Sequence, residues 1–170
     1  MATKRDIDYV DAFPPTMEAL ARGEVLLVST DGQDHSSGMV IGWGSIGIIW
    51  GRAIFTAFVR PSRHTYSLME ATEDFTVNVM SPEFKQAVSF WGKASGRDQD
   101  KWAKTGLLPT PSRHLRSPIV EQGILHFECR TVHRHDLVPA NLAPEIGHAF
   151  YASGDHHKVY YGQILACYGI

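Results

Sequence analysis

Short apolar runs rich in β-branched and aromatic residues recur along the whole chain, separated by polar and glycine-containing turns. Six of them have the length and composition of β-strands: residues 24–30, 38–41, 53–59, 74–80, 123–132 and 158–167. Asp31 and Gly32 lie between the first two runs and are typical turn residues, so these two runs are expected to form an antiparallel pair. The pattern therefore predicts at least six strands.

Helical periodicity is confined to four short segments, residues 15–22, 63–71, 82–90 and 98–104. In the third segment Ser81 is placed as the N-cap and Pro82 at the first helical position. Four apolar residues follow at helical spacing and predict a face that packs on the core: Phe84, Ala87, Val88 and Trp91.

Strands outnumber helices and do not alternate with them regularly. This order argues against a doubly wound parallel sheet and predicts an all-β fold, a Greek-key-like antiparallel barrel with short flanking helices. Residues 107–117 and 138–147 show neither period and are predicted to be surface loops. With 170 residues and 44% hydrophobic positions, the chain is expected to form one domain over residues 1–170.

Charge and composition exclude several classes of protein. Sixteen Lys and Arg against 18 Asp and Glu give a net charge of -2, so no global positive field would attract nucleic acid. The start of the sequence lacks the apolar stretch of a signal peptide, and the longest uncharged run, residues 36–51, is rich in glycine. No membrane segment is expected, and a cytoplasmic location is predicted. Cys129 and Cys167 lie in apolar runs and are predicted to be free core thiols.

Residues 42–47 match the dinucleotide-binding pattern G-x-G-x-x-G, but their context does not fit it. A β-rich run follows instead of a helix, and no acidic residue occurs between Gly47 and Glu70. The glycines instead permit an irregular backbone that a flat ligand can approach closely. The alternative interpretation is a bulged strand or barrel corner without any ligand.

An anion site is predicted where the strand ending at Val59 passes into the next helix. Ser62 is placed as the N-cap and Thr65 as the third helical residue, so free N–H groups, two hydroxyls and the positive end of the helix dipole would converge there. Arg60 and Arg63 add positive charge that suits a phosphate. A capped and simply solvated helix start is the alternative.

A second and weaker anion signal precedes the fourth predicted helix. Ser95 supplies a hydroxyl, and Arg97 and Lys101 are four residues apart and are expected to share one face. Asp98 and Asp100 leave an ordinary salt-bridged helix as the alternative. Together the three segments suggest one ligand with an anionic end and a flat end, which a phosphorylated flavin fits better than a sugar phosphate.

Residues 38–168 resemble the flavin reductase-like family of FMN-binding split barrels, which includes flavoredoxin-type proteins. The segments that carry the resemblance are residues 42–47, 59–66, 95–98 with Lys101, and 155–162. The resemblance implies that FMN is bound non-covalently at the subunit boundary of a homodimer. It also implies that NADH or NADPH delivers hydride to the flavin, and that electrons pass on to free flavin, a metal complex or an electron-acceptor protein.

The same resemblance assigns individual residues. Those that would line the isoalloxazine are Trp43, Gly44, Ser45 and Ile46. Those that would hold the FMN phosphate are Arg60, Ser62, Arg63 and Thr65, and those that would reach the phosphate or the ribityl chain are Ser95 and Lys101. His157 would be the catalytic histidine near the flavin, with the adjacent His156 as a competing assignment.

The predicted function is an FMN-dependent oxidoreductase. The alternatives are a non-enzymatic FMN carrier or electron-transfer module without NAD(P)H turnover, and a ligand-free interaction domain, since no nicotinamide-binding motif can be read from the sequence. His133 and His135 alternate on a predicted strand beside Asp136 and resemble part of a metal site. A third ligand at a recognisable spacing is missing, so no metal is expected.

Overall fold

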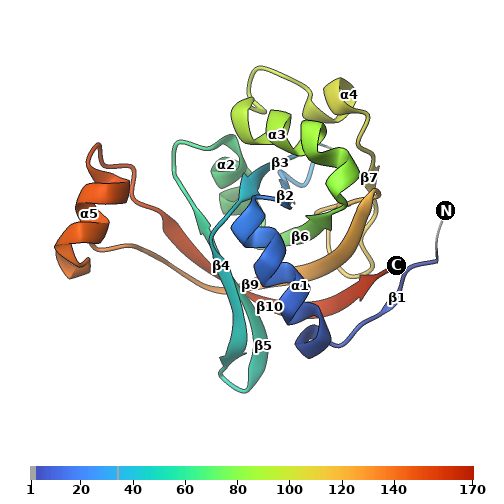
Figure 1. Ribbon diagram of the computed structural model, residues 1–170, viewed down its shortest axis with the longest axis horizontal. Helices are drawn as coiled ribbons and strands as arrows, with labels where there is room; N and C mark the ends of the chain where they lie inside the picture. The colour runs from blue at the N-terminus through green and yellow to red at the C-terminus, as the bar shows by residue number, and fades with distance from the viewer. Residues whose placement is uncertain (1–2, 34) are drawn as a thin grey trace.

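The computed structural model describes residues 3–33 and 35–170, and its main element is one large antiparallel sheet (Figure 1). Eight strands form it: β1 (Arg5–Asp6), β2 (Val25–Thr30), β3 (Ser36–Ile41), β4 (Gly44–Ile49), β5 (Arg52–Val59), β6 (Asp74–Met80), β9 (Gly123–Asp136) and β10 (Lys158–Gly169). The strand order is β3-β2-β6-β9-β10-β5-β4, with β1 beside β10. All six strands predicted from the sequence are present.

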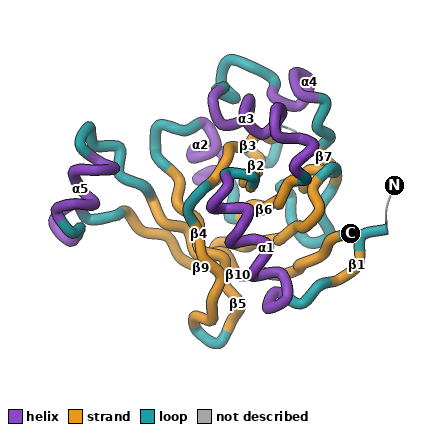
Figure 2. Tube along the Cα trace, viewed as in Figure 1, coloured by secondary structure: helices purple, strands orange, loops and turns teal. Residues whose placement is uncertain are grey.

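The two ends of this strand order, β3 and β4, are neighbours in the chain and are joined only by Gly42 and Trp43. The sheet therefore curls round on itself, while among the described residues no ladder of hydrogen bonds pairs β3 with β4. In Figure 2 the strands accordingly wrap round an interior instead of lying in one flat layer. The predicted all-β split barrel with short flanking helices is confirmed.

The core has two parts, one on each face of β2. Inside the barrel, inward-facing residues of several strands pack together, among them Leu27, Phe55, Phe75, Phe127 and Tyr160. On the outer face, residues of β2 pack against a flanking helix and the segment that follows it: Leu26, Val28, Val88, Trp91 and Leu107. Burial on both faces explains why the β2 run is continuously apolar instead of alternating. Cys129 and Cys167 are buried and unpaired, as predicted.

Five α-helices lie in the described part of the chain: α1 (Tyr9–Arg22), α2 (His64–Ala71), α3 (Lys85–Lys93), α4 (Lys101–Thr105) and α5 (Pro144–Tyr151). Two 3-10 turns precede α3 and α5, η1 (Pro82–Phe84) and η2 (Pro139–Asn141), and a separate pair of short strands is formed by β7 (Pro109–Thr110) and β8 (Ile119–Val120). Figure 1 shows α3 and α4 above the barrel, and α5 far out on the connection between β9 and β10. None of the described helices is long and apolar enough to cross a membrane.

The first and third predicted helices have other boundaries than predicted, although the predicted packing of the third is right. α1 begins at Tyr9 because Asp8 caps it, its carboxylate accepting a hydrogen bond from the N–H of Val10 at 2.8 Å. The third predicted helix is divided, since Pro82 starts a 3-10 turn and α3 begins only at Lys85. The apolar face is confirmed: Val88 and Trp91 are buried, and Phe84 and Ala87 pack against them.

Two predictions of irregular structure are also wrong. Residues 42–51 contain the regular strand β4, and Trp50 and Gly51 form a two-residue hairpin loop with φ of 54° and 68°, which suits the twist of the paired strands. Residues 138–147 contain η2 and the start of α5, where Pro144 occupies the first helical position and Glu145 complements the helix dipole. Residues 107–117 form a loop, interrupted only by β7.

Candidate functional site

Two cavities lie side by side where β5 ends and α2 begins. The larger, which we name the corner cavity, has a volume of about 330 Å³. The smaller, which we name the aromatic cavity, has a volume of about 160 Å³, and both have Met39, Arg60 and Arg63 in their walls. The corner cavity is lined by all six residues that the resemblance assigns to the phosphate or the ribityl chain: Arg60, Ser62, Arg63, Thr65, Ser95 and Lys101.

Lys101 is a buried cation in the wall of the corner cavity. Only 4% of the residue is exposed, and its Nζ donates hydrogen bonds of 2.8 Å to the carbonyl oxygens of Gly38 and Trp91. No carboxylate of a described residue forms an ion pair with it. Burial, followed by repulsion from Arg63, lowers the pKa of Lys101 to about 8. Because an ammonium group has three donors, one N–H is left for a ligand in the cavity.

The first turn of α2 faces the same cavity. Arg63 is the N-cap and His64 the first helical residue, so Thr65 occupies the second position and not the predicted third. Thr65 is 2% exposed, whereas Arg63 is exposed and forms no ion pair with a described carboxylate. A guanidinium, a hydroxyl and the free N–H groups of a helix start therefore converge on the cavity.

Ser62 does not cap α2, which corrects the sequence prediction. Its Oγ donates to Oδ2 of Asp155 at 2.6 Å, and its N–H donates to Oδ1 of the same carboxylate at 3.2 Å. Asp155 belongs to the loop before β10 and also lines the corner cavity. The Ser62 end of the cavity thus already holds an anionic side chain. The space suited to a further anion lies at the end formed by Arg63, Thr65 and Lys101.

Arg60 stands between the two cavities. Its Nη1 donates to the carbonyl oxygen of Asp155 at 3.0 Å, and its Nη2 donates to that of Phe150 at 2.9 Å. The guanidinium also lies 5.1 Å from the ring centre of Tyr151, a cation–π distance. Arg60 therefore fastens the connection between α5 and β10, while its charge faces both cavities. The role in phosphate binding that the resemblance gives it stays a prediction.

Ser95 lies in the loop between α3 and α4, and this loop closes one side of the corner cavity. The Ser95 Oγ accepts a hydrogen bond from the N–H of Arg97 at 3.2 Å. Arg97 in turn reaches across to donate to the carbonyl oxygen of Ser62 at 2.9 Å. Because α4 begins at Lys101 and not at residue 98, Arg97 and Lys101 do not share a helical face, which corrects that prediction.

The aromatic cavity is lined by the end of β3, by Gly42 and Trp43, and by Phe58 and His157. Trp43 is 40% exposed, and its ring centre lies 5.1 Å from that of Phe150 and 4.9 Å from that of His157. Of the residues assigned to the flavin ring, Trp43 lines this cavity. The others lie on β4 and are not part of its wall, so their roles stay predictions: Gly44, Ser45 and Ile46.

His157 is 8% exposed and is held by one hydrogen bond, with 2.7 Å between its Nδ1 and the hydroxyl oxygen of Tyr151. Trp43 and Phe58 flank the imidazole, with ring centres 4.9 and 6.2 Å away. Burial, and then the positive charge of Arg60, lowers the pKa of His157 to about 4. The imidazole is therefore neutral at pH 7 and offers the cavity a hydrogen bond without a charge.

The two adjacent histidines point in different directions, as expected for an extended segment. His157 lines the aromatic cavity, whereas His156 stacks on Tyr151, with ring centres 4.6 Å apart and planes inclined by 11°. The sequence pattern does not single out Tyr151, because it predicts a loop over residues 138–147 and so no helix that would end at Tyr151. Pro144 followed by Glu145 is a helix-start signal that indicates α5 and the position of Tyr151 at its end.

Other candidate features do not build a comparable site. His133 and His135 flank Tyr161, with ring centres 5.4 and 5.7 Å away, and form an aromatic cluster on β9 and β10. Within residues 3–33 and 35–170, no group of three or more His, Cys, Asp or Glu side chains is arranged to hold a metal ion.

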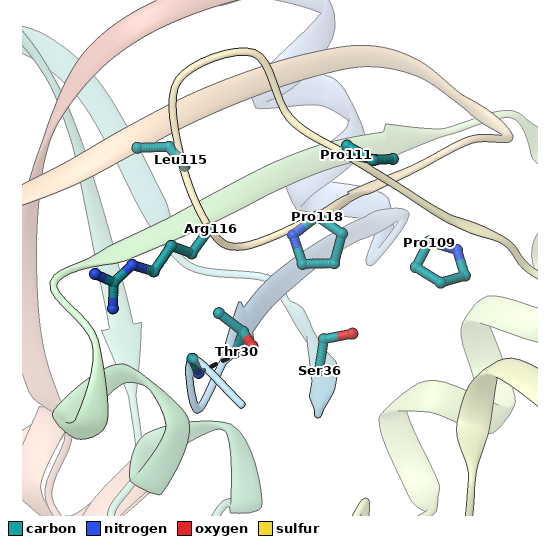
Figure 3. Close-up of a pocket in the computed structure, with 8 residues that line it drawn as sticks. Thr30, Ser36, Pro109, Pro111, Leu115, Arg116 and Pro118 are labelled. Atoms are coloured by element: carbon teal, nitrogen blue, oxygen red, sulfur yellow. Dashed lines mark hydrogen bonds between the residues drawn. The ribbon is translucent and has the colours of Figure 1, made fainter. Parts of the chain in front are cut away.

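A further cavity of about 440 Å³ lies between the start of β3 and the loop that joins β7 to β8 (Figure 3). Three prolines line it, and the Arg116 side chain extends away from them: Pro109, Pro111 and Pro118. Converging charged and polar groups mark the corner and aromatic cavities, which together form the candidate site.

Comparisons with known proteins agree with this geometry. A family profile described as "Flavin reductase like domain" matches residues 17–169. The fold is similar to flavoredoxin of Desulfovibrio vulgaris (Miyazaki F), with a TM-score of 0.69 and 20% identity over 86% of this chain and 68% of that one. No curated protein sequence matches the chain.

Two other solved structures share the fold. An FMN-binding domain of a flavin reductases-like enzyme from Shewanella baltica OS155 has a TM-score of 0.69 and 14% identity over 98% of this chain and 77% of that one. An NADH:FAD oxidoreductase of Streptomyces globisporus C-1027 has a TM-score of 0.65 and 13% identity over 87% of this chain and 76% of that one.

Proposed function

This chain belongs to the flavin reductase-like domain family, and on that premise we propose that it is an oxidoreductase with bound FMN. When bound, the flavin would supply the redox chemistry, with NADH or NADPH as the proposed hydride donor and free flavin, a metal complex or an acceptor protein as the proposed electron acceptor. Two structural neighbours support this proposal, because one is described as an FMN-binding domain and the other as an NADH:FAD oxidoreductase.

The observation that carries the proposal is the buried ammonium of Lys101. A buried charge is normally paired, because removing it from water costs several kcal/mol. The Nζ of Lys101 has two carbonyl acceptors, and the corner cavity lies beside it. A phosphate in that cavity would supply the missing anion, and the pKa of Lys101 would then rise from about 8.

The other groups of the corner cavity suit the same ligand. Arg63 can add a charge-assisted hydrogen bond, and the Thr65 hydroxyl and the α2 N–H groups add neutral donors. Ser95 can donate its hydroxyl hydrogen, because its oxygen accepts from Arg97 and leaves the O–H free. The cationic side chains in the wall, Arg60, Arg63, Lys93 and Lys101, outnumber its one carboxylate, Asp155, and this excess of positive charge suits a phosphate monoester.

The aromatic cavity suits the flat end of the ligand. Its walls include apolar side chains that can pack against a ring, and the exposed backbone at Gly42 leaves N–H and C=O groups accessible. The neutral imidazole of His157 would form a hydrogen bond with the flavin ring. The cavities adjoin through Met39, Arg60 and Arg63, so one molecule could extend through both.

The proposal is tested by titrating the apoprotein with FMN and with riboflavin, which lacks the phosphate, and following flavin fluorescence. We expect FMN to bind about 100-fold more tightly, which corresponds to about 3 kcal/mol from a charged hydrogen-bonded group. Equal affinities would remove the phosphate from the corner cavity. Binding of neither flavin would refute the proposed function.

Turnover is tested separately by mixing the FMN-loaded protein with NADH or NADPH under anaerobic conditions. Rapid bleaching of the flavin absorbance is expected for the oxidoreductase. A protein that binds FMN but is not reduced by either nucleotide would be the non-enzymatic carrier or electron-transfer module instead.

A homodimer is part of the proposal, and three exposed apolar side chains support it. Ile48 and Trp50, on the β4–β5 hairpin, are each 61% exposed, and Val132 on β9 is 37% exposed. Exposed apolar surface of this kind commonly marks a subunit interface. Light scattering of the wild type should give twice the mass of the chain, and Trp50→Ser should weaken the association. The cytoplasmic location stays a prediction.

A further inference from the structure

The hydrogen bond between Tyr151 and His157 lies in surroundings that exclude water. Tyr151 is 6% exposed and His157 is 8% exposed, and 2.7 Å separates the hydroxyl oxygen from Nδ1. The Tyr151 ring is held on its faces, with the Arg60 guanidinium 5.1 Å from its centre and the His156 ring stacked at 4.6 Å. The phenol is therefore fixed in place by contacts that do not depend on His157.

The direction of this hydrogen bond follows from the partners available. The Tyr151 hydroxyl has no other hydrogen-bond acceptor among the described residues. Burial raises the pKa of Tyr151, so the phenol keeps its hydrogen at neutral and moderately alkaline pH. If Nδ1 carried a hydrogen, the phenol hydrogen would be buried without an acceptor, which is costly. The phenol therefore donates, and Nδ1 is the acceptor.

The proton of the neutral imidazole is then on the other nitrogen. A neutral histidine has one N–H, and a hydrogen bond accepted by Nδ1 leaves that N–H at Nε2. No described residue is hydrogen-bonded to Nε2 of His157, and the residue lines the aromatic cavity. Trp43 and Phe58 flank the ring and restrict its rotation.

We propose that Tyr151 is a positioning residue that holds His157 in the Nε2–H form, so that the aromatic cavity presents one neutral hydrogen-bond donor to its ligand. The complementary group is a hydrogen-bond acceptor at the edge of a planar molecule, such as a carbonyl oxygen or an unprotonated ring nitrogen. Identification of that molecule as a flavin rests on the proposed function, whereas the state of His157 does not.

The first test uses the apoprotein and needs no flavin. Long-range ¹H–¹⁵N correlation spectra distinguish a protonated imidazole nitrogen from an unprotonated one, and His157→Gln identifies the signals of this residue. In the wild type at pH 7, Nδ1 of His157 should have the shift of an unprotonated, hydrogen-bonded nitrogen and Nε2 that of a protonated one. A protonated Nδ1 would overturn the proposal.

The variant Tyr151→Phe removes the hydroxyl and keeps the ring that contacts Arg60 and His156. Its Nδ1 signal should move to that of a nitrogen without a donor, and the two nitrogens should become less distinct. Tyr161→Phe is the matched control, because the Tyr161 hydroxyl lies 3.3 Å from Nε2 of His135, outside the site. It should leave the His157 signals in place. Unchanged signals in Tyr151→Phe would overturn the proposal.

The second test measures the rate of flavin reduction by NADH or NADPH in FMN-loaded protein. Tyr151→Phe should lower this rate about two- to tenfold, the usual worth of one neutral hydrogen bond. His157→Gln keeps an amide N–H near the position of Nε2 but has no Nδ1, so adding Tyr151→Phe to it should change nothing further. An equal loss in that background would show that Tyr151 acts elsewhere. If FMN does not bind at all, the proposed function fails while the spectra still decide the role of Tyr151.

Discussion

Two fully buried ionisable groups, Lys101 and Glu128, occupy different parts of this fold and have very different surroundings. Glu128, on β9, is 0% exposed, and its carboxylate accepts three hydrogen bonds of 2.6 to 2.8 Å. The donors are the Tyr168 hydroxyl and the backbone N–H groups of Arg113 and His114. Lys101 has two neutral acceptors and a cavity in place of a third.

The difference distinguishes a structural charge from one that is available to a ligand. A carboxylate surrounded by protein donors ties together the segments that supply them, here β9, β10 and the loop that contains residues 113 and 114. A buried ammonium with an unused donor costs stability unless something else compensates for it. Removing Glu128 should therefore affect folding, and removing Lys101 should affect binding.

The largest effect is expected for Glu128→Gln. The amide cannot accept hydrogen bonds from both backbone N–H groups and the phenol, so the free energy of unfolding should fall by about 2 to 3 kcal/mol. Urea unfolding followed by tryptophan fluorescence measures this loss. FMN affinity should stay within twofold of the wild type.

A matched control is Glu121→Gln, which breaks a partly exposed ion pair of 2.9 Å with Lys4. Its effect on the free energy of unfolding should be no more than about 1 kcal/mol. If Glu128→Gln reduced the free energy of FMN binding more than the free energy of unfolding, the assignment of Glu128 to stability and Lys101 to ligand binding would be wrong.

Lys101→Met should show the opposite pattern. Methionine fills a similar volume and removes the buried charge, but it also loses the two hydrogen bonds to carbonyl oxygens, so the free energy of unfolding of the apoprotein should change by no more than about 1 kcal/mol. Loss of the charged hydrogen bond should weaken FMN binding by about 1.5 to 3 kcal/mol, which is tenfold or more, and leave riboflavin binding unchanged.

The control on the same helix is Lys104→Met, because Lys104 is exposed and does not line the cavity. It should change neither flavin affinity nor stability. Equal loss of FMN and riboflavin affinity in Lys101→Met would mean that the variant disturbs the cavity as a whole.

Much of the fold and part of the site could be predicted from the sequence, because these features depend on patterns of residues that are close together in the chain. Strand runs such as residues 74–80 are predicted correctly because their β-branched and aromatic residues suit the buried sheet that they form in the structure. Arg63 and Thr65 could be anticipated because they lie at a predicted helix start, whereas Lys101 is predicted inside a helix over residues 98–104 and in the structure begins α4. Their convergence on one cavity depends on how α2 and α4 pack beside β3, which no local pattern states.

The remaining features depend on contacts between distant segments. Serine is a residue type that is common at N-caps, yet the hydroxyl of Ser62 donates to Asp155, 93 residues later in the chain. The glycines of residues 42–51 suggest an irregular backbone. In the structure, however, residues 44–49 pair with β5 and form the regular strand β4. Tyr151 matters only because it meets His157 across a loop. Each is a tertiary contact that replaces the local preference.

Arg63→Ala tests whether an exposed charge at the cavity contributes less than the buried one. Arg63 is exposed and forms no ion pair with a described carboxylate. Its contribution to phosphate binding should therefore be near the lower end of the range for a charged hydrogen bond, about 1.5 kcal/mol or tenfold in FMN affinity. Raising the ionic strength should reduce the loss of FMN affinity in Arg63→Ala more than the loss in Lys101→Met, because salt screens exposed charges more strongly than buried ones. Fluorescence titration at two salt concentrations measures both. A salt-independent loss would place Arg63 in a desolvated contact.

The smallest effect is a dependence on pH that belongs to Lys101 alone. Its pKa is lowered from 10.5 to about 8 in the protein, so the ammonium loses its proton above pH 8. FMN affinity should fall by no more than about tenfold between pH 8 and 9, while riboflavin affinity stays level.

Stability of the apoprotein should move the other way. Between pH 8 and 10.5 the unfolded chain still binds the proton that the folded chain has lost, so the contribution of Lys101 to the free energy of unfolding rises with pH in this window. Lys101→Met should remove both dependences at once, because it removes the group that titrates. If FMN affinity still depended on pH in this variant, the dependence would belong to another titrating group, and the buried ammonium would have no part in binding.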